Sequence, residues 1–483
     1  MQLFAAQRIL GLLLILFSLT MLPPLALSLW FGDGTTAAFG SSFGLILATG
    51  AVLWWPTRKV KRELRLRDGF VIVVSFWVGL TLSGSVPFLL LDDVQMSVAD
   101  AVFESASGLT TTGATVIVGL DNLPPAILFY RQLLQWLGGM GIIVLAVAIL
   151  PMLGIGGMQL YRAETPGPMK DNKLTPRITE TAKALWYIYL SFTVVCALGY
   201  WAAGMSVFDA ICHSFSTVSI GGFSTHDASM GYFDNRLIEV VAVVFMALAG
   251  MNFALHFSAW RMKALNPYKA DAELQVYLGL LIVVALVASA YLYASAEFDS
   301  FLDALAHGVF QAVSISTTTG FTTSNYHAWP SFLPVLLLFA SFVGGCAGST
   351  GGGLKVIRVL LLFKQWLREI VRLIHPNAQV PIKVGGTVMP PRVLEAVWGF
   401  FGAYVAAFSL MLLGLMATGL DQVTAFSAVA ACINNLGPGL GDVGAHYGDI
   451  SSTAKLILCL AMLLGRLEIF TLLVVISPIF WRS

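Results

Sequence analysis

A chain of 483 residues in which 57% are hydrophobic and only 11% are charged is far more apolar than a soluble globular protein, where about a quarter of the residues are charged. A formal net charge of +1 excludes the basic surface that binding to nucleic acid requires. The composition therefore predicts an integral membrane protein.

Uncharged stretches long enough to cross a bilayer, which takes about 20 apolar residues, recur along the chain. They lie at 9–32, 34–57, 69–91, 132–161, 184–208, 240–260, 274–296, 328–354 and 396–420, and a tenth, 456–481, is interrupted by Arg466 and Glu468. The first stretch resembles a signal peptide but is too long for one, so we keep it as a membrane helix. We expect ten transmembrane helices.

The distribution of cations predicts the orientation of these helices, because cytoplasmic loops are rich in Lys and Arg. If the N-terminus is cytoplasmic, most of the 27 Lys and Arg residues fall on the inner side. The exceptions are Arg131, Arg236 and Lys455 outside and Arg466 within a span. Acidic residues show the opposite bias, which would concentrate cations at the outer face. Both termini are therefore predicted to be cytoplasmic.

Four connections on the predicted outer side carry a polar stretch centred on glycine, and we call these stretches strips 1 to 4. They are Leu109–Thr115, Val218–Ser224, Ser314–Thr323 and Ile433–Gly439, centred on Gly113, Gly222, Gly320 and Gly437. Each follows a short, mostly apolar helical stretch that opens at Asp100, Asp209, His307 or Thr424. The sequence thus repeats the order span, short helix, strip, span.

The spacing of the four glycines suits two spans with a re-entrant loop between them. We predict an all-α fold of four pseudo-fourfold helix, pore-loop, helix repeats. The repeats are 69–161, 182–262, 272–373 and 391–483, and two additional transmembrane helices precede them in 1–57.

The strips also predict a site that coordinates an ion. Non-helical backbone at membrane depth is tolerated only where it is buried in protein or lines a water-filled cavity. A ring of carbonyls from four strips can replace the hydration shell of a monovalent cation, and glycine permits the positive φ that turns carbonyls inward. The short helices would direct their partially negative C-terminal ends at the ion. The strips therefore predict a cation pore.

With these strips the sequence resembles the Trk/Ktr/HKT superfamily of potassium transporters, and within it the bacterial TrkH subunits, over essentially its whole length. The resemblance implies a potassium selectivity filter and no cofactor, with K⁺ the metal bound at the filter. The filter residues would be Thr110, Thr111, Thr112, Gly113, Ser219, Ile220, Gly221, Gly222, Thr317, Thr318, Thr319, Gly320, Asn434, Asn435, Leu436 and Gly437. Gly113 implies potassium, since plant relatives that prefer sodium carry serine there.

A gate is expected beneath the filter. The run 344–353 is too rich in glycine to continue a regular helix, because each interior glycine costs about 1 kcal/mol. The resemblance implies that it is an intramembrane gating loop, made of Gly344, Gly345, Gly348, Ser349, Thr350, Gly351, Gly352 and Gly353. The alternative is close helix packing through small residues, which is our interpretation of Gly138–Gly141.

Arg466 lies within the last span, where a cation is costly and usually functional. By resemblance we interpret it as part of the gate, a pore-facing cation under the filter. The alternative is a structural ion pair or a cap on backbone carbonyls. Glu468 is two positions away, on another helix face, and is a poor partner for it.

Other motifs carry no separate function. Gly439–Gly444 matches the dinucleotide pattern, but no strand precedes it. The five cysteines form no pair or metal motif and are interpreted as packing residues. We expect solvated or helix-capping roles for the four histidines near the predicted outer mouth, His213, His226, His307 and His327. No catalytic set can be assembled, so the chain is not expected to be an enzyme.

The predicted function is potassium uptake across the bacterial inner membrane. The resemblance implies a homodimer embedded in membrane lipid and a cytosolic nucleotide-binding regulatory subunit resembling TrkA, with no nucleic acid partner. An alternative is a secondary transporter that couples K⁺ or a small solute to H⁺ or Na⁺ symport. Such transporters often have inverted repeats, whereas these four repeats run in one direction. A second alternative is a membrane scaffold with packed re-entrant loops.

Overall fold

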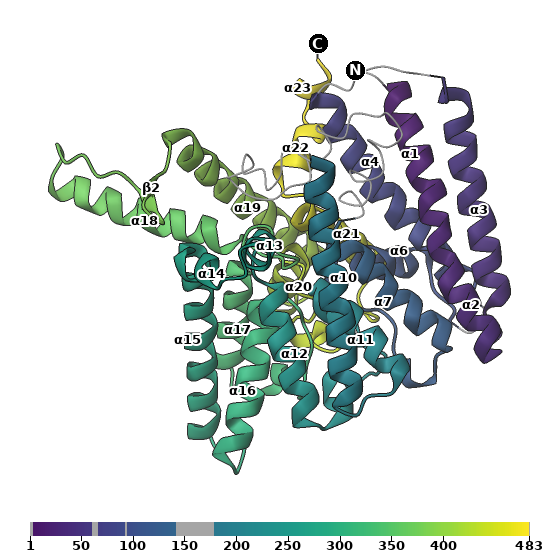
Figure 1. Cartoon of the computed structure of the whole chain (residues 1–483), viewed down its shortest axis with the longest axis horizontal. Coiled ribbons are helices and arrows are strands. Elements are labelled where there is room, and N and C mark those ends of the chain that lie inside the picture. Colours follow the sequence, from purple (N-terminus) through teal and green to yellow (C-terminus); the bar gives the residue numbers. More distant parts are fainter. Residues whose placement is uncertain (1–2, 60–65, 92–93, 142–177, 483) are drawn as a thin grey trace.

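The computed structural model describes residues 3–59, 66–91, 94–141 and 178–482, and this part of the chain consists mainly of helices (Figure 1). Both ends of the described chain lie at the same end of the molecule, which we call the terminal side. A small antiparallel hairpin is formed by β1 (Lys383–Val384) and β2 (Thr387–Val388). All five cysteines are buried free thiols, as expected of packing residues.

The N-terminal helices form a separate pair beside the rest of the bundle (Figure 1). Leu3–Ser18 (α1), Leu19–Met21 (η1) and Leu22–Phe31 (α2) make the first crossing, and Thr36–Trp54 (α3) followed by Trp55–Thr57 (η2) makes the second. Helices α1 and α3 touch at Gly11 and Gly50. A Cβ added to either glycine would lie less than 3 Å from the backbone oxygen of the other. The missing side chains therefore allow the two backbones to meet.

Within the described residues, the order of long helix, short helix, strip and following helix occurs four times. Repeat 1 contains α4 (Leu66–Gly84), α5 (Val86–Leu89), α6 (Val98–Leu109), η3 (Leu120–Asn122) and α7 (Pro125–Gly139). Repeat 2 contains α10 (Ile178–Ala202), α11 (Val207–Ser219), η5 (Ser229–Phe233), α12 (Arg236–Ala249), α13 (Phe253–Met262) and α14 (Asn266–Ala270). Repeat 3 contains α15 (Ala272–Ala294), α16 (Phe301–Ser316), η6 (Tyr326–Ala328), α17 (Phe332–Val343) and α18 (Val356–Ile374). Repeat 4 contains α19 (Pro391–Ala417), α20 (Gln422–Ile433), η7 (Gly441–Val443), α21 (Ser452–Arg466), α22 (Phe470–Ile476) and α23 (Pro478–Trp481).

The short helices α6, α11, α16 and α20 begin a few residues earlier than the sequence analysis placed them. The reason is local, because each begins after a capping side chain that accepts a hydrogen bond from a backbone N–H of the first turn. The caps are Ser97, Ser206, Ser300 and Asp421. Each short helix then leads directly into its strip.

The four repeats close into a ring. The long helix after each strip packs on the short helix of the next repeat, in the pairs α7 with α11, α12 with α16, α17 with α20, and α21 with α6. The last pair joins repeat 4 to repeat 1. The four strips are therefore held inside a closed bundle, where their non-helical backbone is shielded from lipid.

Three of the predicted spans are broken rather than straight. Helices α12 and α13 meet at 92°, and α21 and α22 at 116°. A loop separates α17 from α18, as the glycine-rich run 344–353 predicted, whereas the straight spans expected at 240–260 and 456–481 are wrong in this respect. Local chemistry explains the first two breaks: Asn252 caps α13 by accepting from Ala254 N, and Glu468 has a positive φ of 51°.

Within the described residues, six helices are long and apolar enough to cross a membrane, or eight if each bent pair counts as one span. The predicted number of ten is therefore not confirmed. Much of the span expected at 132–161, and the cationic loops around 60–65 and 162–177, lie outside the described residues.

We predict that Gly50→Leu separates α1 from α3 and lowers the melting temperature in detergent, since overpacking a close contact costs about 1–3 kcal/mol. Gly44→Leu is the matched control, because Gly44 lies on the same helix with nothing within 4 Å of its Cβ position. Equal melting temperatures for the two variants would contradict the close contact.

Candidate functional site

The four strips interlock around one axis. A Cβ added to each central glycine would overlap the carbonyl oxygen that precedes the central glycine of the next strip. The pairs are Gly113 with Gly221 O, Gly222 with Thr319 O, Gly320 with Leu436 O, and Gly437 with Thr112 O. The contacts run from strip 1 to 4 and back to 1, so these four carbonyl oxygens form a closed ring.

The strips share one backbone conformation. The central glycines have φ between 78° and 99°. Two positions earlier, Thr111, Ile220, Thr318 and Asn435 also have positive φ, between 53° and 69°. Residues other than glycine rarely adopt such angles, and four equivalent cases indicate a conformation that the surrounding fold imposes.

Polar side chains stabilise the strips from within. The hydroxyl of Thr110 bonds that of Thr112 at 2.7 Å, and Thr317 and Thr319 repeat this contact in strip 3. Asn435 Nδ2 donates to Thr112 Oγ1 across the junction of strips 4 and 1, at 3.0 Å. All the predicted filter residues are buried or half-buried in the strips. Among the described residues, no group of three or more His, Cys, Asp or Glu side chains could hold a metal ion.

A buried ion pair lies behind strips 1 and 2. Arg131 Nε donates to Glu104 Oε1 at 2.8 Å, and both side chains are at most 1% exposed. Arg131 also donates to Ser224 O at 3.1 Å, and Glu104 accepts from Val116 N at 3.0 Å. Arg131 is expected on the outer side of the membrane, and the structure shows that its side chain is buried. Its position beside Gln132 and Gln135 in an apolar stretch was the available signal for a buried polar face.

The glycine-rich loop lies directly against three strips. Thr350 Oγ1 donates to Val218 O of strip 2 at 3.0 Å. Gly352 N donates to Thr318 Oγ1 of strip 3 at 2.7 Å, and Gly353 N to Asn434 O of strip 4 at 3.0 Å. The loop therefore crosses the axis on which the strips converge.

Arg466 reaches the remaining strip. Its Nη1 lies 3.4 Å from Thr111 Oγ1 of strip 1, and its Nη2 donates to Gly138 O and Gly139 O at the end of α7. The loop and Arg466 thus contact all four strips from one side. The contacts with Gly138 O and Gly139 O match the capping alternative, and the contact with Thr111 places the guanidinium beside strip 1.

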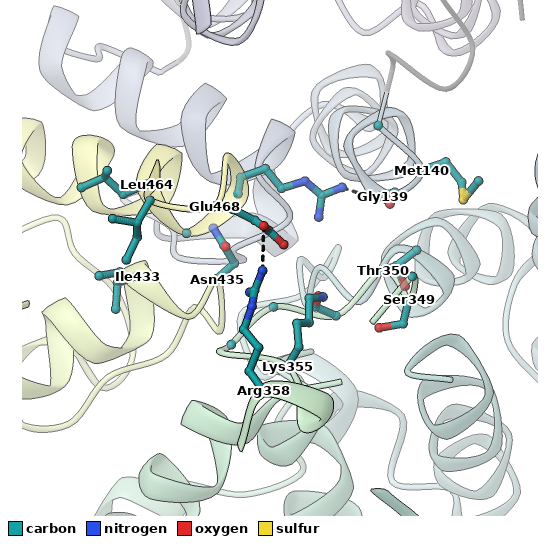
Figure 2. Close-up of a pocket in the computed structure, with 18 of the residues that line it drawn as sticks. Gly139, Met140, Ser349, Thr350, Lys355, Arg358, Ile433, Asn435, Leu464 and Glu468 are labelled. Atoms are coloured by element: carbon teal, nitrogen blue, oxygen red, sulfur yellow. Dashed lines mark hydrogen bonds and ion pairs between the residues drawn. The ribbon is translucent and has the colours of Figure 1, made fainter. Parts of the chain in front are cut away.

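A cavity of about 140 Å³ lies next to the loop and Arg466 (Figure 2). Lys355 and Arg358 extend into it from the start of α18, and Arg358 pairs with Glu468 at 2.7 Å. Lys355 Nζ donates to Gly351 O of the loop. The sequence analysis counted both cations with a cytoplasmic loop, but both side chains are buried.

Ion pairs neutralise several acids on the side opposite the termini. Asp100 of α6 accepts from Lys455 of α21 at 2.6 Å, and Asp303 of α16 accepts from Arg236 of α12 at 2.6 Å. Each pair joins two neighbouring repeats. These acids therefore hold the ring together as well as contributing charge to its face.

His226 and His327 line a second cavity, about 270 Å³, together with the central glycines Gly113, Gly222 and Gly320. His226 Nδ1 bonds Asp121, its Nε2 lies 3.5 Å from Asp209 Oδ1, and its ring stacks on Tyr232. His213 is fully buried and bonds Ser224 Oγ at 2.9 Å. The interpretation of His213 as a solvated histidine is therefore wrong, because its side chain is fully buried.

Residues 36–482 match the model of the TrkH family, which is described as a cation transport protein. The chain belongs to the TrkH cation transport family. It is therefore a multi-pass membrane protein and a transporter, not an enzyme.

Full-length relatives agree with this assignment. The chain is 59% identical to the Trk system potassium uptake protein TrkH of Vibrio parahaemolyticus, over 100% of both chains. It is 55% identical to the TrkH of Escherichia coli over 99% of both, and 44% identical to the TrkG of the same organism over 98% of this chain and 97% of that one. The crystal structure of the potassium transporter TrkH from V. parahaemolyticus superposes with a TM-score of 0.91 at 57% identity, covering 100% of each chain.

The contacts of His226 predict a pH-dependent stability. Partial burial lowers the pKa of His226, but its bonds to Asp209 and Asp121 outweigh this, so the pKa is raised above 6.5. The ion pair then stabilises the fold fully below the unfolded pKa of about 6.5, and this stability is lost as pH rises through the higher folded pKa. We expect the melting temperature of the wild type to exceed that of His226→Gln at about pH 6 and to approach it at about pH 9.

His375→Gln is the control for this titration, because His375 is exposed at the end of α18, far along the chain from the cluster. A difference between wild type and His226→Gln that does not change with pH would contradict the assignment. The neighbouring rings of His213 and Tyr232 remain in both proteins.

Proposed function

We propose that this chain takes up potassium through a pore lined by the four strips. The observation that carries the proposal is the closed ring of carbonyl oxygens from Thr112, Gly221, Thr319 and Leu436. The names of the relatives, Trk system potassium uptake proteins, support potassium as the ion.

The ring suits a weakly hydrated monovalent cation. Carbonyl dipoles can replace the hydration shell of K⁺, while the number and field strength of the dipoles disfavour other ions. The remaining predicted filter residues set the conformation that aims these oxygens. Potassium is the permeating substrate here, and no cofactor takes part in this proposal.

The loop 344–353 and Arg466 act as the gate in this proposal. The loop makes three hydrogen bonds to strips 2, 3 and 4, and each contributes about 0.5–1.5 kcal/mol. Three such hydrogen bonds stabilise the closed state of the loop by only a few kcal/mol. A partner that binds the open state somewhat more tightly than the closed state could therefore shift the equilibrium.

The proposed location is the bacterial inner membrane with both termini in the cytoplasm, which follows from the distribution of cations. Helix α18 and the β1–β2 hairpin project from the bundle (Figure 1). The helix exposes apolar side chains there, including Trp366, Leu373 and Ile374. We propose that this surface binds a second copy of the chain, forming a homodimer, or binds the nucleotide-binding regulator resembling TrkA.

We predict that Gly113→Ser reduces the preference for K⁺ over Na⁺ about tenfold, because its Cβ overlaps Gly221 O of the ring and must displace it. The measurement is flux of each ion into vesicles that contain the purified protein. Gly119→Ser is the control: Gly119 has the same φ of 81° but nothing within 4 Å of its Cβ position. Unchanged selectivity in Gly113→Ser would refute the filter assignment.

We also predict that Thr350→Val raises basal flux about tenfold, since it removes hydrogen bonds from the loop to Val218 O and Ala249 O worth about 1 kcal/mol each. Removing residues 345–352 should raise basal flux further. Thr49→Val is the control, because Thr49 bonds only its own exposed helix in the contacts described. Low flux in a folded loop deletion would show that the loop does not close the pore.

A further inference from the structure

Strip 2 lacks a side chain at a position where the other strips have one. Thr112 and Thr319 precede their central glycines in strips 1 and 3, and each carries a hydroxyl that bonds within its own strip. Leu436 fills this position in strip 4 and is fully buried in apolar surroundings. In strip 2 the position is Gly221, which has no side chain.

Gln135 from repeat 1 fills that space. A Cβ on Gly221 would overlap the Gln135 carboxamide, so a larger residue there would exclude it. The carboxamide donates from Nε2 to Gly221 O at 2.6 Å and accepts at Oε1 from Phe223 N at 3.0 Å. Gln135 is fully buried. It therefore binds the backbone on both sides of Gly222, the central glycine of the strip.

The surrounding face of α7 shows that this contact is built into the fold. Gln132 accepts from Ser216 Oγ of α11, and Arg131 donates to Ser224 O just beyond the strip. Glu104 in turn holds Arg131. Strip 3 has a bond of this kind from its own repeat, through Ser314 Oγ to Phe321 O, while strip 4 has one from its own repeat, through Tyr447 OH to Gly437 O, and one from repeat 3, through Tyr326 OH to Gly439 O.

We propose that Gln135 is a positioning residue that sets the ion preference of the filter through the carbonyl of Gly221. This assignment rests on the proposed function of the strips as a potassium pore. Gly221 O belongs to the ring of carbonyl oxygens. The N–H of Gln135 fixes the direction of this carbonyl, and the hydrogen bond reduces the electron density that the oxygen offers to an ion. A ring with one such weakened ligand has a lower field strength, which favours K⁺ over the smaller, more strongly hydrated Na⁺.

The test replaces Gln135 with methionine, which has a similar volume but no such donor or acceptor. We expect the ratio of K⁺ to Na⁺ flux in reconstituted vesicles to fall about tenfold, as for the loss of one or two buried hydrogen bonds. The ratio compares two ions through the same molecules, so it does not depend on the folded fraction. Gln275→Met on the exposed start of α15 is the control and should leave the ratio unchanged.

A second pair of variants tests the same contact if Gln135→Met does not fold. Gly221→Thr alone should lose flux, because its side chain overlaps Gln135. Gly221→Thr with Gln135→Ala removes the overlap, so flux should return, but with a ratio of K⁺ to Na⁺ flux about tenfold below that of the wild type, because no Gln135 donor reaches Gly221 O. A wild-type ratio in the double variant would overturn the proposal.

The outcomes separate this inference from the proposed function. If the wild type shows no preference for K⁺, the pore assignment itself fails. If the wild type is selective and Gln135→Met has the same ratio, the pore stands and the role of Gln135 is overturned.

Discussion

The structure depends on one constraint, which is that backbone without helical hydrogen bonds must find partners inside the membrane. Four strips meet this constraint by packing against one another, each central glycine against a carbonyl of the next strip. The absence of a Cβ at these four positions allows that contact. The caps of the short helices, the contacts between neighbouring repeats and the ion pairs of Asp100 and Asp303 then hold the strips in place.

The broken helices follow from the same arrangement. A straight α17 would leave no segment to cross beneath the strips, whereas the loop after Val343 reaches strips 2, 3 and 4. The break after α12 lets Gly250 and Asn252 receive this loop, through Gly250 O accepting from Cys346 N at 2.9 Å. The break after α21 leaves Arg466 below strip 1 and brings Glu468 to Arg358. The helices are thus interrupted where the loop 344–353 and Arg466 make polar contacts with the strips.

Much of the fold could be predicted from local sequence. Apolar length indicates spans, and the recurrence of a central glycine after a short helix indicates four repeats. The positions that failed are those whose partners lie far along the chain. The sequence alone does not show that Arg131 is buried, because its partners Glu104 and Ser224 are brought beside it only by the fold. Gln135 belongs to no sequence motif, and its contact could not be predicted because its partner, Gly221, lies 86 residues away in the chain. Lys355 and Arg358 are buried by a helix break that apolar length alone does not indicate.

The cyclic contact of the glycines has a consequence for how the protein is made. The contact that completes strip 1 comes from Gly437, near the end of the chain, against Thr112. Synthesis and membrane insertion of the first three repeats therefore leave the ring open on one side, with strip 1 lacking its neighbour. The ring of strips closes only when the last repeat enters the membrane, so a chain truncated within that repeat cannot complete the contact at strip 1.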